Sequence, residues 1–299
     1  MTVLSIQQGS NCVVGQFRAM ASPCEVLLEA RDNALCHRLT QLAAAEAERI
    51  EQKYSRYRPG SVLSRINANA GSWQALDSET TQLLAFAERC YQLSDGLFDI
   101  SSGILRRAWR FDGSDNIASQ PDIDQLLPFV GWHKVKLEAQ QLFLPTGMEL
   151  DLGGIAKEYA VDKVLQLLQQ QFAAQQAPSL VVNFGGDMAC NRPRDDGSLW
   201  RIGIENPTLA DQAISAVGLS SGALATSGDS RRFLLKDGVR YSHILNPKTG
   251  WPISNAPRSV TVAAPNCLLA GMLATTALLQ GADAEAFLQA QQLQYWLVA

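Results

Sequence analysis

The centre of this chain is the stretch Asp151-Leu152-Gly153-Gly154-Ile155-Ala156-Lys157-Glu158-Tyr159-Ala160-Val161-Asp162. It opens a helical pattern that continues to about Phe172, and Asp151 is a favourable helix N-cap residue. Gly153 and Gly154 let the backbone come close to a ligand, and free N–H groups at a helix start favour an anion. Lys157 adds a positive charge one turn into the helix. We therefore predict an anion-binding turn here.

Composition places the chain among ordinary globular proteins. It has 299 residues, of which 46% are hydrophobic and 18% charged, with a net charge of −4. The negative balance, and the lack of any basic run of five residues, argue against a nucleic-acid partner. No unbroken apolar run reaches the roughly 18 residues that a membrane span needs.

The first residues and the cysteines bear on location. The segment from Met1 to Gln8 has neither a basic region nor an apolar core, so no signal peptide is visible. The six cysteines form no CxxC pair, which is typical of thiols in a reducing compartment. We expect a cytoplasmic protein, although a trimmed periplasmic one would look the same.

Hydrophobic periodicity predicts a mixture of helices and strands. Helices are expected over 32–54 (capped by Asp32), 61–66, 79–93 (capped by Ser78), 151–172 and 267–279 (capped by Asn266), with another after Asp283. Strands are expected over 17–30, 135–137, 142–144, 180–184, 200–205, 213–224, 233–235, 240–243, 259–264 and 294–298. Residues 111–128 should form an exposed loop with a turn of helix at 122–127. Frequent hairpins without strict βαβ alternation favour the α+β class.

Five polar turns that contain glycine lie next to these elements. They are Ser94-Asp-Gly-Leu-Phe-Asp99, Asp151-Leu-Gly-Gly154, Asn183-Phe-Gly-Gly-Asp187, Thr226-Ser-Gly-Asp229 and Asn246-Pro-Lys-Thr-Gly250. Each alone is most often a plain turn. Their number favours a phosphate-bearing ligand, but none matches the Walker or dinucleotide motif, so a standard nucleotide-binding mode is disfavoured.

Two side chains leave a structural and a chemical interpretation open. His243 ends a strand, where it is either a half-buried histidine bonded to backbone or a general base beside the turn at Lys248. Thr275 lies in an apolar helix. Its hydroxyl either bonds back to the preceding turn or ligates a hard cation.

Together these segments resemble the FAD:protein FMN transferases, the ApbE family of flavin transferases. The resemblance covers nearly the whole chain, in order. Besides the five turns, it rests on Phe17-Arg-Ala-Met-Ala-Ser22, Ser55-Arg-Tyr-Arg-Pro59, Leu63-Ser-Arg-Ile-Asn67, the Ile155-Ala-Lys157 continuation, His243-Ile-Leu245 and Ala270 to Thr275.

The resemblance implies one α+β domain over residues 1–299. Its two intertwined lobes would have mixed and antiparallel sheets flanked by helices around a deep FAD cleft. It implies Mg²⁺-dependent transfer of the FMN half of FAD to a Ser or Thr hydroxyl of a partner flavoprotein, with release of AMP. Such phosphoryl transfer needs charge neutralisation and positioning, and His243 is the candidate base for the acceptor hydroxyl.

Position by position, the resemblance also implies which residues form the site. The flavin-contacting positions are Met20, Tyr57, Leu97, Phe98, Asp99, Asp151, Lys157 and Ile244. The positions around the metal are Gly154, through its carbonyl, Ala274 and Thr275.

The chain departs from the family pattern at several positions. Gly271 stands where similar proteins carry a metal-ligating Asp, and Glu158 stands where Gly is frequent. Ala21-Ser22 replaces a common Gly-Thr, and Asn246 replaces a frequent Asp. Because Mg²⁺ prefers a carboxylate, Gly271 predicts weaker metal affinity, and the nearest substitutes are Asp187 and Asp283. An FAD-binding protein with little or no transferase activity, or an FAD pyrophosphatase, therefore remains an alternative.

Overall fold

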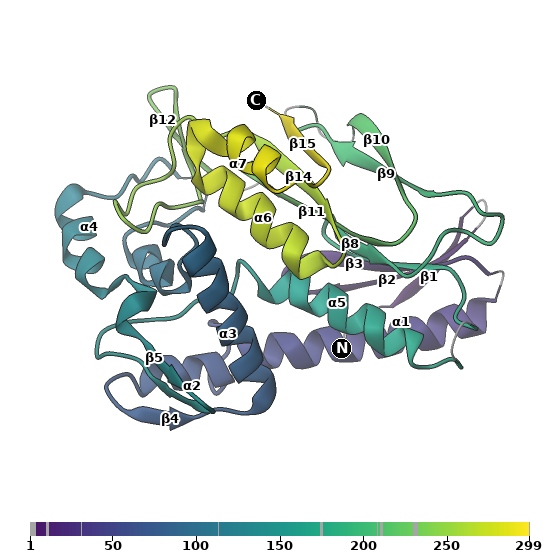
Figure 1. Cartoon of the computed structure of the whole chain (residues 1–299), viewed down its shortest axis with the longest axis horizontal. Coiled ribbons are helices and arrows are strands. Elements are labelled where there is room, and N and C mark those ends of the chain that lie inside the picture. The colour runs from purple at the N-terminus through teal and green to yellow at the C-terminus, as the bar shows by residue number, and fades with distance from the viewer. Residues whose placement is uncertain are drawn as a thin grey trace.

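A computed structural model describes residues 4–9, 12–30, 32–112, 114–173, 176–207, 209, 212–229 and 233–298. Its main feature is an eight-stranded sheet in the order β1-β2-β3-β7-β8-β11-β14-β15 (Figure 1). Every neighbouring pair in it is antiparallel, so the predicted α+β class is confirmed. The strands are β1 (Ser5–Gln8), β2 (Val13–Ala19), β3 (Ser22–Leu28), β7 (Leu180–Phe184), β8 (Asp187–Cys190), β11 (Gly222–Gly228), β14 (Ser259–Ala264) and β15 (Tyr295–Val298).

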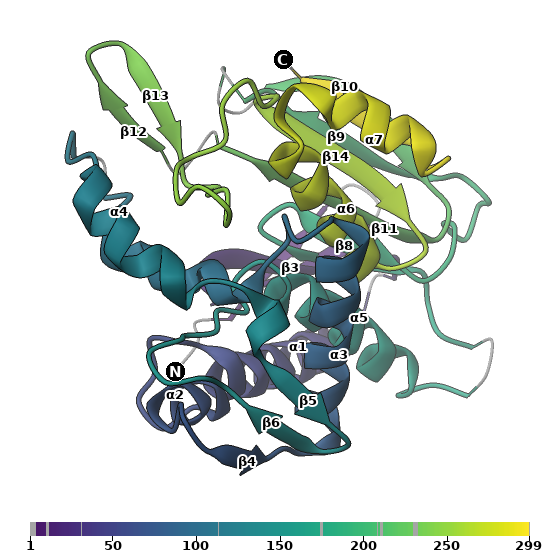
Figure 2. The same cartoon turned by 60° about the vertical axis from the view of Figure 1, so that its left-hand side comes forward.

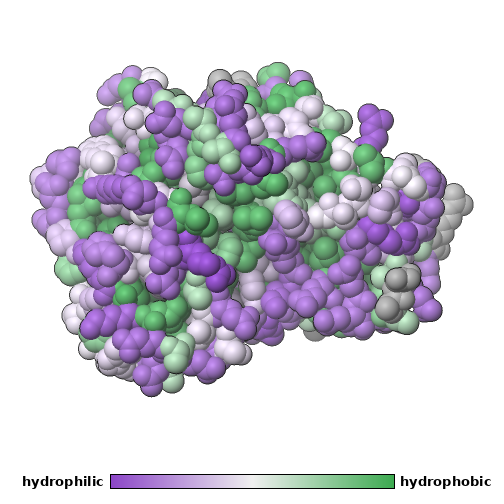
Figure 3. All heavy atoms as spheres, viewed as in Figure 1, coloured by the Kyte–Doolittle hydropathy of each residue, from purple (hydrophilic) through white to green (hydrophobic). Residues whose placement is uncertain are grey.

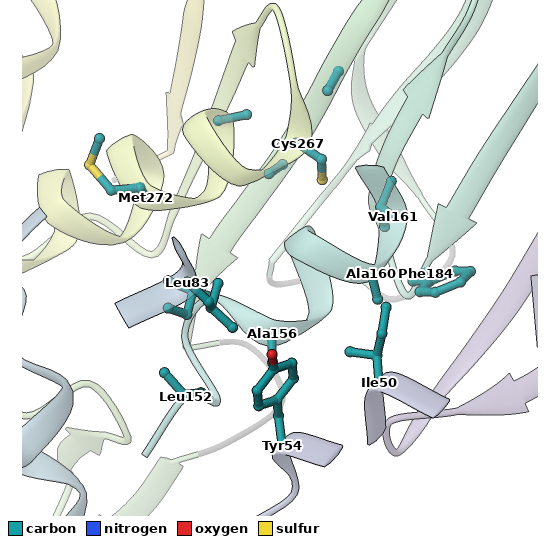
Figure 4. Packing of buried hydrophobic residues seen from close by; sticks show 14 of the residues in the cluster. Ile50, Tyr54, Leu83, Leu152, Ala156, Ala160, Val161, Phe184, Cys267 and Met272 are labelled. Atoms are coloured by element: carbon teal, nitrogen blue, oxygen red, sulfur yellow. The ribbon is translucent and has the colours of Figure 1, made fainter. Parts of the chain in front are cut away.

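Three helices cover one face of this sheet. They are α1 (Asn33–Tyr54), α5 (Ala156–Gln169) and α6 (Cys267–Leu279), and they pack on β2 and β3, on β7 and β8, and on β11 and β14. Figure 4 shows Ile50 and Tyr54 of α1 pointing toward Ala160 and Ala156 of α5. Small residues on α5 thus allow a close approach of the two helices, which places the predicted anion-binding turn near the end of α1.

The other face of the sheet is covered by the hairpin of β9 (Trp200–Glu205) and β10 (Ala213–Leu219). Side chains alternate between faces along a strand. Val182 and Phe184 accordingly belong to the core under the helices, whereas Val181 packs in a separate cluster with Trp200.

The segment between α1 and α5 builds a second region (Figure 2). It contains α2 (Val62–Ala68), α3 (Ser78–Leu93) and a small sheet of β4 (Trp73–Ala75), β6 (Gln141–Phe143) and β5 (Lys136–Glu138). Short helices follow at Ile100–Arg107, α4 (Gln120–Leu126), Leu127–Phe129 and Trp132–Lys134. The hairpin of β12 (Phe233–Lys236) and β13 (Val239–Ser242) packs against this region through Leu234 and Tyr241. A short helix (Gly281–Asp283) and α7 (Ala284–Ala290) precede β15.

Several predicted boundaries were wrong. Helix α5 begins at Ala156 and ends at Gln169, so Asp151 is not its N-cap, because residues 152–155 form a turn before the helix. Asp77, rather than Ser78, caps α3 by accepting from the Thr80 N–H. The single strand predicted over 213–224 is two strands, β10 and β11, in different sheets. Strand β11 begins at Gly222, whose φ of 89° glycine adopts easily.

The predicted exposed loop over 111–128 is partly buried. Ala118 and Ile123 pack around Trp109, whose indole N–H donates to the Gly250 carbonyl at 2.8 Å. Local composition indicates a loop, but this tertiary contact with a distant segment decides its burial.

Among the described helices, none is long and apolar enough to cross a membrane. The face in Figure 3 is mainly polar at its periphery, with apolar residues gathered near its middle.

Glu79 at the start of α3 ties three elements together. Its carboxylate accepts from Arg49, Lys53 and the Tyr159 hydroxyl, at 2.7 to 2.9 Å. The Arg49 hydrogen bond, reinforced by Lys53 and Tyr159 against a smaller opposing effect of burial, lowers the pKa of Glu79 to about 2. Ionised Glu79 therefore stabilises the folded state.

We expect Glu79→Gln to lower the free energy of unfolding by about 1 kcal/mol at neutral pH, since the network is partly solvated. A carboxyl group whose pKa is lower in the folded state than in the unfolded state stabilises the folded protein at any pH above its ordinary, unfolded pKa. This stabilisation is lost as the pH falls through the pKa of the folded state. The difference from the unsubstituted protein should therefore hold above about pH 4.5 and shrink toward pH 2, as measured by urea unfolding. Glu48→Gln on the exposed face of α1 is the control, with less than about 0.5 kcal/mol expected. A difference that stays constant over this pH range would contradict the prediction.

Candidate functional site

A cavity of about 800 Å³ opens between the large sheet and the second region. Its wall includes the β2–β3 turn, the end of α1, the segment around Phe98, the turn before α5, strands β11 and β14, and α6. All but one of the predicted site residues line it: Met20, Tyr57, Leu97, Phe98, Asp99, Asp151, Gly154, Lys157, His243, Ile244 and Thr275. Ala274 does not, because its side chain is fully buried in the core.

Asp151 sits within a cluster of charges at the cavity wall. Its carboxylate accepts from Arg56 at 3.0 Å, pairs with Arg106 at 3.2 Å, and accepts the Gly153 N–H at 2.8 Å. The same Arg56 pairs with Glu149, which also holds Arg107. Because Asp151 takes one glycine N–H, fewer backbone donors are left for an anion than we predicted. The three arginines of this cluster outnumber its two carboxylates, Glu149 and Asp151, so the cluster nevertheless has a formal charge of +1.

Lys157 lies one turn into the same segment, in a buried acidic environment. Its ammonium is 2.6 Å from the Asp187 carboxylate, whose side chain is only 2% exposed. Burial lowers the pKa of Lys157, but Asp187 and Glu158 outweigh burial, so the pKa is raised and the residue stays charged. Burial, followed by the charge of Asp187, raises the pKa of Glu158. Asp187 also accepts the Thr226 N–H at 3.0 Å.

Aromatic and apolar side chains line another part of the wall. Tyr57 is 78% exposed, a large fraction for an aromatic residue, and the Arg56 guanidinium lies 5.9 Å from the centroid of its ring. Phe98, which follows Leu97 in the chain, is buried against the core and also lines the cavity. The Asp99 carboxylate is occupied by the N–H groups of Ser101 and Trp132, which makes it a scaffold of this wall.

The β2–β3 turn at the cavity contains two residues in the left-handed region, Met20 (φ 52°) and Ala21 (φ 58°). The Met20 N–H donates to the Glu51 carboxylate at 2.7 Å, which fixes the turn against α1. Two-residue hairpins of this kind favour Asn-Gly, because residues with a Cβ are strained at positive φ.

We expect Ala21→Gly to raise the free energy of unfolding by about 1 kcal/mol, since glycine removes the strain of the left-handed conformation. Thermal or urea unfolding measures the change. The matched control, Ala45→Gly on the exposed face of α1, should lower stability by about 1 kcal/mol. Equal losses in both variants would show that the turn is not strained.

Hydroxyl groups from three elements meet near the start of β14. Thr275 of α6 bonds the Ser227 hydroxyl at 2.7 Å, and Thr226 bonds the Thr261 hydroxyl at 2.8 Å. Three buried atoms have no hydrogen-bond partner in the described part of the chain: Glu158 Oε2, Asp187 Oδ2 and Ser259 Oγ. Asp187 Oδ2 still lies within ion-pair distance of Lys157, so its charge is balanced. Oxygen atoms of this kind fit a hard cation, although no group of three or more acidic, His or Cys side chains forms a metal cluster within the described ranges.

His243 follows directly after β13 at the rim of the cavity. Its ring lies edge-on to Phe111, with centroids 6.3 Å apart. The next residue, Ile244, accepts the Ile253 N–H through its carbonyl, and Leu245 forms a bridge with Pro252. The segment after His243 is therefore anchored, which orients the imidazole at the cavity.

Fold and site together define a protein whose cavity, large enough for a dinucleotide-sized ligand, is built from segments spread along the chain. The same fold occurs in the solved ApbE protein of Thermotoga maritima, with a TM-score of 0.85, 27% identity and coverage of 99% of this chain and 94% of that one. It occurs again in the flavin transferase ApbE of Vibrio cholerae, with a TM-score of 0.82, 27% identity and coverage of 99% and 94%.

Sequence comparison agrees with the fold. An FAD:protein FMN transferase of Vibrio cholerae is 33% identical, over 79% of this chain and 71% of the relative. One of Haemophilus influenzae is 31% identical, over 78% and 70%. The model of the ApbE family matches residues 20–297. The chain belongs to the ApbE family, and the predicted family is confirmed.

Sequence reasoning assigned no role to Arg56, Arg106 or Glu158, all of which line the cavity. Arg56 lies within the motif Ser55-Arg-Tyr-Arg-Pro59, so its positive charge could have been predicted to face an anionic ligand. Glu158 was visible as a departure from the family pattern, but no sequence feature related it to Gly271. Of the two substitute carboxylates considered, Asp187 lies beside the cavity and Asp283 does not line it.

Proposed function

We propose that this protein transfers the FMN moiety of FAD to a Ser or Thr hydroxyl of a partner flavoprotein and releases AMP. The observation that carries the proposal is the cavity itself, whose wall contains residues from four of the five polar turns together with Lys157, Arg56 and Arg106. Family membership supports the same activity.

In the proposed reaction, the acceptor oxygen forms a bond to the FMN-side phosphorus of the pyrophosphate. The bond from that phosphorus to the bridging oxygen breaks, and AMP leaves with the bridging oxygen. His243 accepts the proton of the acceptor hydroxyl, and Lys157 with the arginines favours the negative charge of the phosphates. Tyr57 and Phe98 offer apolar surface to the isoalloxazine ring.

The residues present also fit a divalent cation. The Thr275 hydroxyl and the Gly154 carbonyl are the predicted oxygen ligands, and the unpartnered buried oxygens nearby suit a hard ion. When bound, Mg²⁺ would neutralise charge on the pyrophosphate.

The proposal is tested by incubating the purified protein with FAD, MgCl₂ and a recombinant flavoprotein domain that bears a Ser/Thr flavinylation site. We expect a fluorescent acceptor band that survives denaturation, a mass increase of one FMN less water, and an equal amount of AMP. AMP and free FMN without the acceptor would instead show a pyrophosphatase. Bound FAD with no AMP would show a carrier protein, and either result would overturn the proposal.

A further inference from the structure

Gly271 of α6 faces the side chain of Glu158 on α5. A Cβ placed on Gly271 would lie 2.5 Å from Cγ of Glu158, and 3.1 Å from its Cδ and Oε1. No ordinary side chain tolerates the first of these distances, and helix interiors disfavour glycine. Glycine at 271 therefore provides the space that the Glu158 side chain fills.

The Glu158 carboxyl group lies in this space with one of its oxygens lacking a hydrogen-bond partner among the described residues. The residue is 7% exposed, lines the cavity, and its Oε2 has no hydrogen-bond partner in the part of the chain that the structure describes. The neighbouring ammonium of Lys157 is already held by Asp187 at 2.6 Å. Two buried carboxyl groups, Glu158 and Asp187, thus share the single ammonium of Lys157, and a further cation beside them would stabilise their ionised forms.

The position of Glu158 brings its carboxylate to other oxygen ligands. Residues 271 and 275 lie one turn apart on the same face of α6, so the Glu158 carboxyl end lies within one helical turn of Thr275. Thr275, Gly154 and Glu158 all line the cavity. A carboxyl group, a hydroxyl and a backbone carbonyl that line one cavity offer the kinds of oxygen ligand that Mg²⁺ and Mn²⁺ prefer.

We propose that Glu158 supplies the carboxylate ligand of a divalent cation in this cavity, and that Gly271 is required to admit it. The role of this cation in FMN transfer rests on the proposed function, whereas the binding of the cation to the protein does not. The two departures from the family pattern, Glu158 in place of Gly and Gly271 in place of Asp, are then two parts of one change: the carboxylate ligand comes from α5 instead of α6.

The direct test measures Mn²⁺ binding to the purified protein, without added FAD, by the electron paramagnetic resonance signal of free Mn²⁺. Glu158→Gln, which keeps the size of the side chain, should weaken Mn²⁺ binding at least tenfold. Asp283→Asn, an exposed carboxylate away from the cavity, is the control and should leave the affinity unchanged. Unchanged affinity in E158Q, or no Mn²⁺ binding by the unsubstituted protein, would overturn the inference.

The exchange of the two residues provides the second test. Gly271→Asp alone should lower the melting temperature for two reasons. The new Cβ collides with the Glu158 side chain, and the new carboxylate places a second acidic group beside it. The double variant E158G/G271D removes the collision and should recover both the melting temperature and Mn²⁺ affinity to within about threefold of the unsubstituted protein. Recovery of folding without Mn²⁺ binding would show that a carboxylate at position 271 does not replace Glu158, which would overturn the idea that the two positions exchange one ligand.

The two proposals fail in different ways. If the protein transfers no FMN but E158Q loses Mn²⁺ affinity, the metal ligand stands and the proposed function is wrong. If the unsubstituted protein transfers FMN and E158Q binds Mn²⁺ equally well, the function stands and the inference is wrong.

Discussion

Lys157→Met should destabilise the folded protein by about 3–5 kcal/mol. The substitution keeps the apolar stem of the side chain and removes only the ammonium group, which lies 2.6 Å from Asp187. The Asp187 side chain is only 2% exposed, so without the lysine its buried carboxylate would lose its countercharge in a medium of low polarity. Urea unfolding at neutral pH, without divalent cations, measures the loss.

Lys248→Met is the matched control for this effect. Lys248 pairs with Asp95 at 3.5 Å, but their side chains are 54% and 102% exposed, so water screens the interaction. Its removal should change stability by less than about 0.5 kcal/mol. If Lys157→Met were as stable as the control, the buried pair would not contribute to folding.

His243→Asn should reduce the rate of FMN transfer by about 10²- to 10⁴-fold, while the dissociation constant of FAD stays within a few-fold of its original value. The reason is that a positioned base acts on the acceptor hydroxyl and not on FAD. Stopped assays of acceptor labelling give the rate, and quenching of flavin fluorescence gives the affinity.

His133→Asn is the control for the histidine prediction. His133 is exposed and bonds the Tyr91 hydroxyl at 3.1 Å, away from the cavity lining. It should leave the transfer rate unchanged. A His243 variant that loses FAD affinity in proportion to its rate would instead assign His243 to ligand binding.

Local signals in the sequence were enough for many elements. Asp32 and Asn266 cap α1 and α6 by accepting from Leu35 and Leu269, as predicted. Asp237 and Gly238 form the turn between β12 and β13, both with positive φ. Capping and tight turns depend on residues within a few positions of each other, which is why these predictions were confirmed.

Signals that depend on distant partners were misjudged. The start of α5 lies at Ala156 because Asp151 is engaged by Arg56 and Arg106, which come from other segments. Helix and capping propensities cannot predict which of two roles such an Asp takes. An Asp that precedes an apolar helical pattern is equally suited to cap the helix or to pair with an arginine from a distant segment.

For the candidate site, the ordered motifs determined the family and the α+β fold from the sequence alone. The roles of the individual site residues stay predictions, although the fold brings nearly all of them to one cavity. Only the tertiary structure showed that the side chain of Glu158 occupies the space beside Gly271. The physical reason is that the packing of α5 against α6 sets this contact. Such packing depends on the whole fold, whereas a cap or a hairpin turn depends on its immediate neighbours.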